Sequence, residues 1–143
     1  MGTLDRERIL AKLDELHGYL TELDGIAPRD FAEYQKVEKK RACERLLQLS
    51  IEVVIDICHL LVSGLRLGLP AEEDDLFKKL LDARILSEEM GETLREMKGF
   101  RNILVHEYAR VNDRLVYEAV RTKEEDFHSF QMGVVAYLNR QEE

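Results

Sequence analysis

The chain has 143 residues, of which 45% are hydrophobic and 35% charged, so it can bury a core and is not compositionally disordered. Its 8 glycines and 2 prolines are too few for the dense turns of a β-sandwich or barrel, and long segments rich in Leu, Glu, Lys and Arg favour helices. With 21 Lys and Arg against 29 Asp and Glu, the net charge of -8 excludes a uniformly basic nucleic-acid coat protein, but not a local basic site.

The cysteines and the absence of an apolar leader bear on location. Cys43 and Cys58 lie in apolar helical sequence without a Cys-x-x-Cys pair, so we expect two buried, reduced thiols. The first residues are charged and contain no signal segment. The most apolar stretch, 46–62, carries polar side chains that would be costly in lipid: Gln48, Glu52, Asp56 and His59. We therefore expect a cytoplasmic protein with no membrane contact.

The first predicted helix runs from about Leu4 to Leu23, with Thr3 as its N-cap and Asp24-Gly25 as its end. Its apolar positions follow the i, i+4, i+7 spacing of one buried stripe: Ile9, Leu13, Leu16, Leu20 and Leu23.

A longer second helix is predicted to open at a capping box formed by Asp30 and Glu33 and to continue to about Ser63. The acidic run 72–75 marks the start of a third helix, where four acids suit the positive end of the helix dipole. Nothing near this run completes a metal-ligand set, so we expect it to cap the helix.

Three further helices are expected in the second half of the chain. Ser87 caps one that runs from about Glu88 to Ala109, and Asn112-Asp113 caps a short one after it. Thr122 and Glu125 form a capping box for the last helix. No period-2 alternation lasts for a full strand and no repeat or linker interrupts the sequence. Residues 1–143 are therefore predicted to form a single all-α domain, an antiparallel bundle of about five to six helices.

A polar stripe follows the apolar second helix at steps of three and four residues, which places it on one face: Arg45, Gln48, Glu52, Asp56, His59 and Ser63. The stripe is either a solvated outer face or the lining of a polar cleft or subunit interface. In the second case Glu52 and Asp56 could orient an Arg or His from another helix. A glycosidase carboxylate pair is disfavoured, because no aromatic sugar platform accompanies these residues.

The fourth helix contains a cluster of polar groups among apolar residues: Arg101, Asn102, His106 and Tyr108. At about 100° per residue, His106 lies roughly 140° round the helix from Arg101, whereas Tyr108 returns to the same side as Arg101. A kink at Gly99, the reach of the Arg side chain, or a second copy of the helix across a two-fold axis would each bring Arg101 and His106 together.

These groups suffice for RNA cleavage without a metal. The 2′-hydroxyl attacks the adjacent phosphorus, a His transfers the proton, and an Arg stabilises charge on the phosphoryl oxygens. The sequence contains no evident metal-ligand set, such as paired His, Asp-x-Asp or clustered Cys.

The stretch 101–108 reads R-N-I-L-V-H-E-Y, an R-x4-H-x-Y motif, and resembles the HEPN superfamily, in particular its HepT-like ribonuclease toxins. The likeness extends over nearly the whole chain. It includes Leu69-Pro70, Ile85-Leu86-Ser87, the sequence from Met97 to Asn102, Val116-Tyr117 and the segment 51–57.

The resemblance implies a two-fold homodimer with the catalytic cleft at its interface, and a metal-independent endoribonuclease without cofactor. Arg101, His106 and Asn102 match the family's catalytic positions, and Glu52 and Asp56 match supporting acidic positions. The partner that it implies is an MntA-type nucleotidyltransferase antitoxin, which transfers AMP to the motif tyrosine, here Tyr108, and could form a higher assembly with the toxin.

Basic residues could supply the attraction to RNA phosphates. They are Lys36, Lys39, Lys40, Arg41, Arg45, Arg110, Arg114 and Arg121, and ordinary solvated, paired charges are the other interpretation. Two alternatives to the ribonuclease also stay open: a non-catalytic helical module that binds a nucleotide or partner, and a bundle scaffold without chemistry.

Overall fold

The structure, a computed structural model, describes residues 4–106 and 111–141, and over these ranges it contains seven helices and no strand. The all-α prediction is confirmed, but a total of five to six helices is too low. The helices are α1 (Arg6–Ile26), α2 (Phe31–Tyr34), α3 (Val37–Gly64), α4 (Glu73–Asp82), α5 (Glu88–His106), α6 (Asp113–Thr122) and α7 (Glu124–Gln141).

The extra helix arises because the predicted second helix divides into α2 and α3. Asp30 caps α2 by accepting a hydrogen bond from the Glu33 N–H at 2.8 Å, as predicted. Lys36 then adopts extended dihedral angles (φ -63°, ψ 128°), which interrupts the helix before Val37. The interruption lets α2 pack its aromatic rings against α6. The ring centres of Phe31 and Tyr34 lie 5.5 and 5.9 Å from the ring centre of Tyr117.

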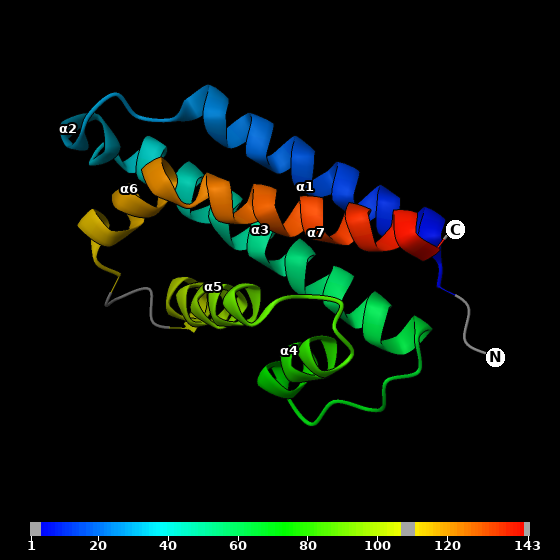
Figure 1. Cartoon of the computed structure of the whole chain (residues 1–143). Coiled ribbons are helices and arrows are strands. Elements are labelled where there is room, and N and C mark those ends of the chain that lie inside the picture. The colour runs from blue at the N-terminus through cyan, green and yellow to red at the C-terminus, as the bar shows by residue number, and fades with distance from the viewer. Residues whose placement is uncertain (1–3, 107–110, 142–143) are drawn as a thin grey trace.

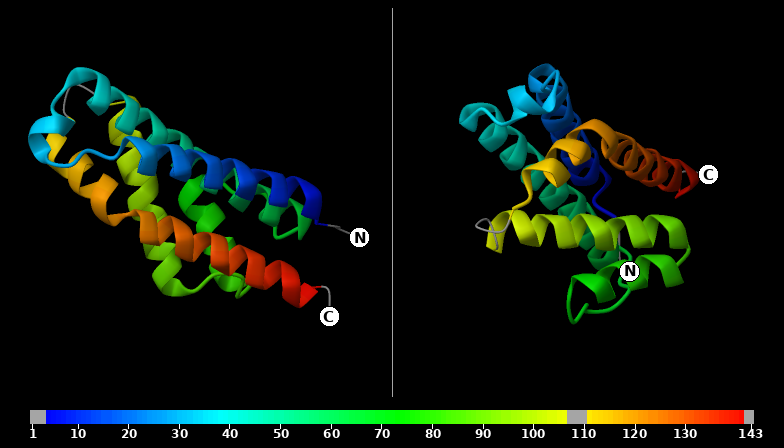
Figure 2. Two further views of the ribbon diagram at one scale, coloured as in Figure 1. Left: turned by 90° about the horizontal axis from the view of Figure 1, so that it is seen from above. Right: turned by 90° about the vertical axis from the view of Figure 1, so that its left-hand side faces the viewer.

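The long helices α1, α3 and α7 lie along one direction, with α1 antiparallel to the other two (Figure 1). Helix α5 does not join this arrangement. It is seen along its axis in Figure 1 and from its side in the right-hand view of Figure 2, so it crosses the three long helices. The predicted antiparallel bundle therefore describes only part of the fold, and the helix with the Arg-x4-His motif lies across it.

Helix α3 is the central helix of the core. It packs against α1, α2, α4, α5 and α6. By length and apolarity it could span a membrane, but 56% of its most apolar window is buried inside the fold, which is the situation of a core helix. The predicted stripe of α1 is confirmed, because all five of its residues are buried: Ile9, Leu13, Leu16, Leu20 and Leu23.

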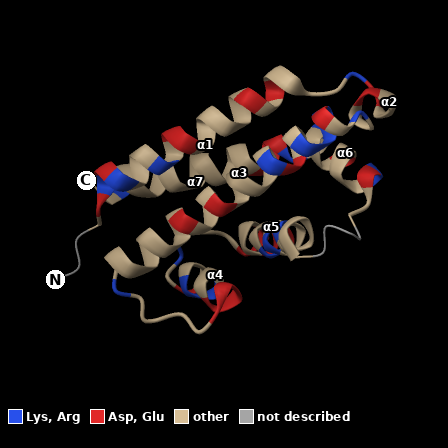
Figure 3. Cartoon of the chain, turned by 180° about the vertical axis from the view of Figure 1, so that it is seen from behind, with Lys and Arg blue, Asp and Glu red and all other residues tan. Residues whose placement is uncertain are grey.

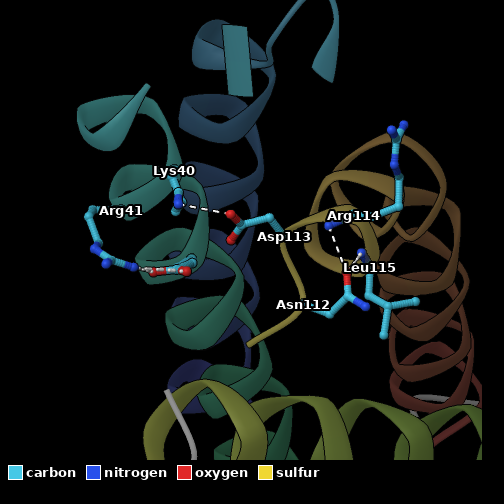
Figure 4. A network of polar contacts seen from close by, with 7 residues as sticks. Lys40, Arg41, Asn112, Asp113, Arg114 and Leu115 are labelled. Carbon is cyan, nitrogen blue, oxygen red and sulfur yellow. Dashed lines mark hydrogen bonds and ion pairs between the residues drawn. The ribbon is translucent and has the colours of Figure 1, made fainter. Parts of the chain in front are cut away.

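Several predicted helix caps are present in the structure. Ser87 Oγ accepts a hydrogen bond from the Met90 N–H at 3.1 Å. Asn112 Oδ1 accepts hydrogen bonds from the N–H groups of Arg114 and Leu115 at 2.9 and 3.3 Å (Figure 4). These side chains satisfy backbone donors that have no partner within the helix, so α5 and α6 start where the sequence predicts.

Two predicted helix starts are wrong. Helix α1 begins at Arg6, since the side chain of Asp5 accepts a hydrogen bond from the Arg8 N–H at 3.1 Å; Thr3 lies outside the described residues. Thr122 does not cap α7, because its hydroxyl donates to the Glu118 carbonyl at 2.7 Å and it is the last residue of α6. Asp5 is therefore the N-cap of α1, and Thr122 ends α6 instead of opening α7.

Helices α3 and α4 end in the same way, at an arginine with left-handed backbone angles: Arg66 has φ 54° and Arg84 has φ 59°. After α4, the Ile85 N–H donates to the Leu80 carbonyl at 3.0 Å, and the Arg84 N–H donates to the Leu81 carbonyl at 2.9 Å. This pair of bonds is a Schellman motif, in which glycine is the usual residue at the left-handed position.

Candidate active site

The motif residues lie on the last two turns of α5, which is helical from Glu88 through Gly99 to His106. Arg101 and Asn102 are half-buried and His106 is exposed. Tyr108 lies outside the described residues. Because the helix continues through Gly99, a kink there does not bring Arg101 and His106 together, and they remain roughly 140° apart round one helix.

The Arg101 side chain is held at two points. Its Nη2 donates to Glu73 Oε1 of α4 at 2.5 Å, and its Nε donates to Asn102 Oδ1 at 3.0 Å. The side chain is only 15% exposed. A guanidinium has five N–H donors, so three of them are not used by these two bonds and can meet an anion such as phosphate.

The first turn of α4 provides a second bond to α5 beside the first. Lys98 Nζ donates to Asp74 Oδ1 at 2.8 Å. Figure 3 shows this acidic turn next to α5. The acidic run was predicted to act as a cap; Asp75 does accept a hydrogen bond from the Ala71 N–H at 3.0 Å, but Glu73 and Asp74 pair with α5 instead. The sequence analysis did not predict these contacts. The signal for them was the pair of cations Lys98 and Arg101, which lie three residues apart on α5 and require acidic partners when they are partly buried.

The polar stripe of α3 forms its hydrogen bonds with residues outside the Arg-x4-His motif. Asp56 Oδ2 accepts a hydrogen bond from Lys12 Nζ of α1 at 3.3 Å, and Glu52 accepts one from Gln48 at 3.1 Å. Although burial, the largest single influence, lowers the pKa of Lys12, the hydrogen bond and charge of Asp56 give a net rise. In the described part of a single chain, the stripe is an outer face, and neither carboxylate contacts Arg101 or His106.

The basic residues near the start of α3 are largely paired. Lys40 Nζ lies 2.8 Å from Asp113 Oδ2 of α6, and Arg41 lies 2.8 Å from Glu44 (Figure 4). Arg114 stacks on Phe31, with its guanidinium carbon 3.9 Å from the ring centre. These contacts join α2, α3 and α6, so these three cations have structural partners already. Arg110 lies outside the described residues.

Within the described ranges, no group of three or more His, Cys, Asp or Glu side chains could hold a metal ion. Cys43 and Cys58 are both buried and unbonded to each other, as predicted. Burial raises the pKa of the Cys58 thiol well above its ordinary value. Neither thiol is placed to act as a nucleophile, because the reactive form is the thiolate.

An all-α fold whose crossing helix ends in Arg-Asn-x3-His defines a protein of the HEPN class. A family profile described as "Ribonuclease HepT-like" matches residues 9–133. The chain belongs to the HepT-like ribonuclease family, as the motif and its surroundings predicted.

Two relatives that are named as nucleases are similar in sequence. The mRNA nuclease HepT of Shewanella oneidensis is 33% identical over 84 residues, which cover 59% of this chain and 63% of that protein. The aligned part of this chain thus spans just under two thirds of that relative's length. The tRNA nuclease HepT of Aphanizomenon flos-aquae is 28% identical over 144 residues, which cover 100% of this chain and 98% of that protein.

Solved structures share the fold. The cytosolic protein YutE of Bacillus subtilis superposes with a TM-score of 0.84 at 23% identity, over 99% of this chain and 95% of YutE. The tri-AMPylated HEPN toxin of Shewanella oneidensis, in complex with its MNT antitoxin, superposes with a TM-score of 0.83 at 26% identity, over 90% of this chain and 96% of the toxin.

Proposed function

We propose that this chain is a metal-independent endoribonuclease toxin that is neutralised by a nucleotidyltransferase antitoxin. The observation that carries the proposal is the fixed, mostly buried guanidinium of Arg101 on the helix that ends at the exposed His106. The family supports it, because two relatives are named as RNA nucleases and one solved toxin is AMPylated in complex with its antitoxin.

In this proposal the ribose 2′-hydroxyl attacks the adjacent phosphorus, and the bond from phosphorus to the 5′-oxygen of the next nucleotide breaks. His106 transfers a proton in this step, since histidine is the side chain that most often moves protons in catalysis. Arg101 donates hydrogen bonds to the phosphoryl oxygens as their negative charge grows, and Asn102 holds the guanidinium from the Nε side.

A homodimer would complete the site. Arg101 and His106 of one chain point to different sides of α5, so a partner copy across a two-fold axis would bring the two kinds of side chain around one RNA linkage. We expect the second copy to lie against the outer face of α3, where Glu52 and Asp56 then act as supporting residues.

Regulation acts through Tyr108. An MntA-type antitoxin transfers AMP to this hydroxyl, and the bulk and negative charge of AMP exclude the RNA phosphate from the site. The chain acts in the cytoplasm as a single domain over residues 1–143. The cytosolic description of YutE and the burial of α3 within the fold support this location.

The direct test compares RNA cleavage by the parent protein and by variants, with EDTA present to remove divalent metals. We expect His106→Ala to lower the rate by a factor of about 10²–10⁴ and Arg101→Ala by about 10²–10³. His128→Ala is the matched control, because this exposed histidine lies on α7. A dimeric parent protein that leaves RNA intact would overturn the proposal and favour the non-catalytic binding module.

Modification is tested separately. Incubation with an MntA-type nucleotidyltransferase and ATP should add the mass of AMP to the parent protein and abolish cleavage. Tyr108→Phe should block both effects, whereas Tyr137→Phe on α7 should block neither. AMP found on another residue, or cleavage that persists in the modified protein, would contradict the assigned role of Tyr108.

A further inference from the structure

The contact between Arg101 and Glu73 joins a motif residue to an acidic side chain from a different helix, 28 residues earlier in the sequence. The two side chains are 15% and 30% exposed, so the ion pair is largely shielded from water. Holding a long Arg side chain in one orientation costs conformational entropy. The shielded hydrogen bond to Glu73 at 2.5 Å offsets this cost better than a fully exposed ion pair would, because water screens exposed charges.

We infer that Glu73 is a positioning residue for Arg101: it fixes the guanidinium so that the unused N–H groups face the RNA phosphate. The inference rests on the proposed ribonuclease function and adds to it a residue outside the Arg-x4-His motif. Glu73 acts through Arg101 and does not itself touch the RNA.

The geometry supports positioning from two sides. Asn102 accepts from Nε and Glu73 accepts from Nη2, so the two bonds use donors on different nitrogens of a rigid plane. Two bonds to a planar group fix both its place and its rotation. Both hydrogens of Nη1 and one of Nη2 are unused by these bonds, which is sufficient for a two-pronged contact with phosphate.

The neighbouring ion pair between Lys98 and Asp74 provides a control that distinguishes positioning of Arg101 from simple attachment of α4 to α5. Lys98 and Asp74 join the same two helices at 2.8 Å, and neither forms a hydrogen bond or ion pair with the Arg101 side chain. If Glu73 only attached α4 to α5, loss of Asp74 would have the same effect on cleavage as loss of Glu73. If Glu73 positions Arg101, only its own loss changes the chemical step.

Charge and reach can also be separated by substitution. Glu73→Gln keeps the length of the side chain and an acceptor oxygen but removes the charge, whereas Glu73→Asp keeps the charge but withdraws it by one methylene. A carboxylate near the phosphate site also repels RNA, so its removal does not weaken substrate binding. Positioning therefore predicts a fall in kcat with KM for RNA unchanged or lowered.

The experiment measures kcat and KM for RNA cleavage by the parent, Glu73→Ala, Glu73→Gln, Glu73→Asp and Asp74→Ala. We expect kcat to fall about 10- to 100-fold for Glu73→Ala and Glu73→Asp, since a misplacement near 1 Å has effects of this size. Glu73→Gln should stay within about threefold of the parent, as expected for a retained hydrogen bond. Asp74→Ala should stay within about twofold, because it removes only a partly exposed ion pair and keeps both polar partners of Arg101.

A second readout does not depend on activity. In nitrogen-15 NMR spectra, the Arg101 Nε–H should give a sharp, slowly exchanging signal in the parent, Glu73→Gln and Asp74→Ala. That signal should be lost in Glu73→Ala and Glu73→Asp. If the parent protein cleaves no RNA but the signal follows this pattern, the proposed function fails and the positioning of Arg101 stands.

Three results would overturn the inference. Equal losses in Asp74→Ala and Glu73→Ala would mean that both residues only attach α4 to α5. Faster cleavage by Glu73→Ala would mean that the carboxylate competes with phosphate for Arg101. An Arg101 signal and a kcat that are unchanged in Glu73→Ala would mean that Asn102 and the helix hold the guanidinium without Glu73.

Discussion

Replacement of Gly99 by alanine should stabilise the protein. Gly99 lies inside α5, and a Cβ built on it meets no heavy atom within 4 Å outside its own helix backbone and chain neighbours. Glycine in a helix interior is about 0.5–1 kcal/mol less favourable than alanine, because it loses more conformational freedom on folding. We therefore expect the free energy of unfolding to rise by about 0.5–1 kcal/mol, and Tm by about 2–4 °C.

Two other helical glycines provide matched comparisons. Gly18 in α1 also has nothing within 4 Å of its added Cβ, so Gly18→Ala should give a similar gain. Gly91 in α5 is buried, and its added Cβ would lie 2.6 Å from Leu81 Cδ1. Leu81 would have to move, which offsets the gain in helix propensity, so Gly91→Ala should be the least stable of the three variants.

The assay is urea unfolding followed by circular dichroism at 222 nm, with linear extrapolation to water. RNA cleavage by Gly99→Ala should equal that of the parent, because α5 is unbroken at this position. A Gly99→Ala variant that loses stability while Gly18→Ala gains it would refute the reasoning, since it would reveal a close neighbour or a strained backbone at Gly99.

Three further predictions concern stability. Asn112→Ala should lower the free energy of urea unfolding by about 1 kcal/mol, because α6 loses its N-cap. Asn112→Asp should retain most of this stability, because Asp also caps helices, and an equal loss in both variants would contradict the capping role. Arg84→Gly should raise the free energy of unfolding by about 1 kcal/mol, since glycine suits the φ of 59°; a loss would show that the arginine side chain matters more. Tyr34→Phe should raise Tm or leave it unchanged, because the buried hydroxyl has no hydrogen-bond partner among the described residues; a fall of several degrees would reveal a partner.

The parts of the fold that the sequence could predict are those set by local chemistry. The stripe of α1 follows from a repeat of apolar residues, and the caps at Ser87 and Asn112 follow from side chains that satisfy nearby backbone donors. The break at Lys36 could not be predicted in this way. It depends on the packing of Phe31 and Tyr34 against α6, which lies far away in sequence.

The candidate site shows the same division. The motif on α5 could be read from residue types and spacing, and so could the family. The contact between Glu73 and Arg101 could not, because it depends on how α4 packs on α5. The acids of α3, which the resemblance singled out as supports, contact Lys12 and Gln48 within one chain. Their relation to the motif residues of a second copy stays a prediction.

The two ion pairs between α4 and α5 affect how the site opens. Both helices pack on α3, on the side away from α1 (Figure 1). A fluctuation that lifts one of them from α3 carries the other along, so their amide protons should exchange with solvent as one cooperative group. In such an opening we expect Arg101 and Glu73 to leave α3 and return to it together, with their ion pair intact.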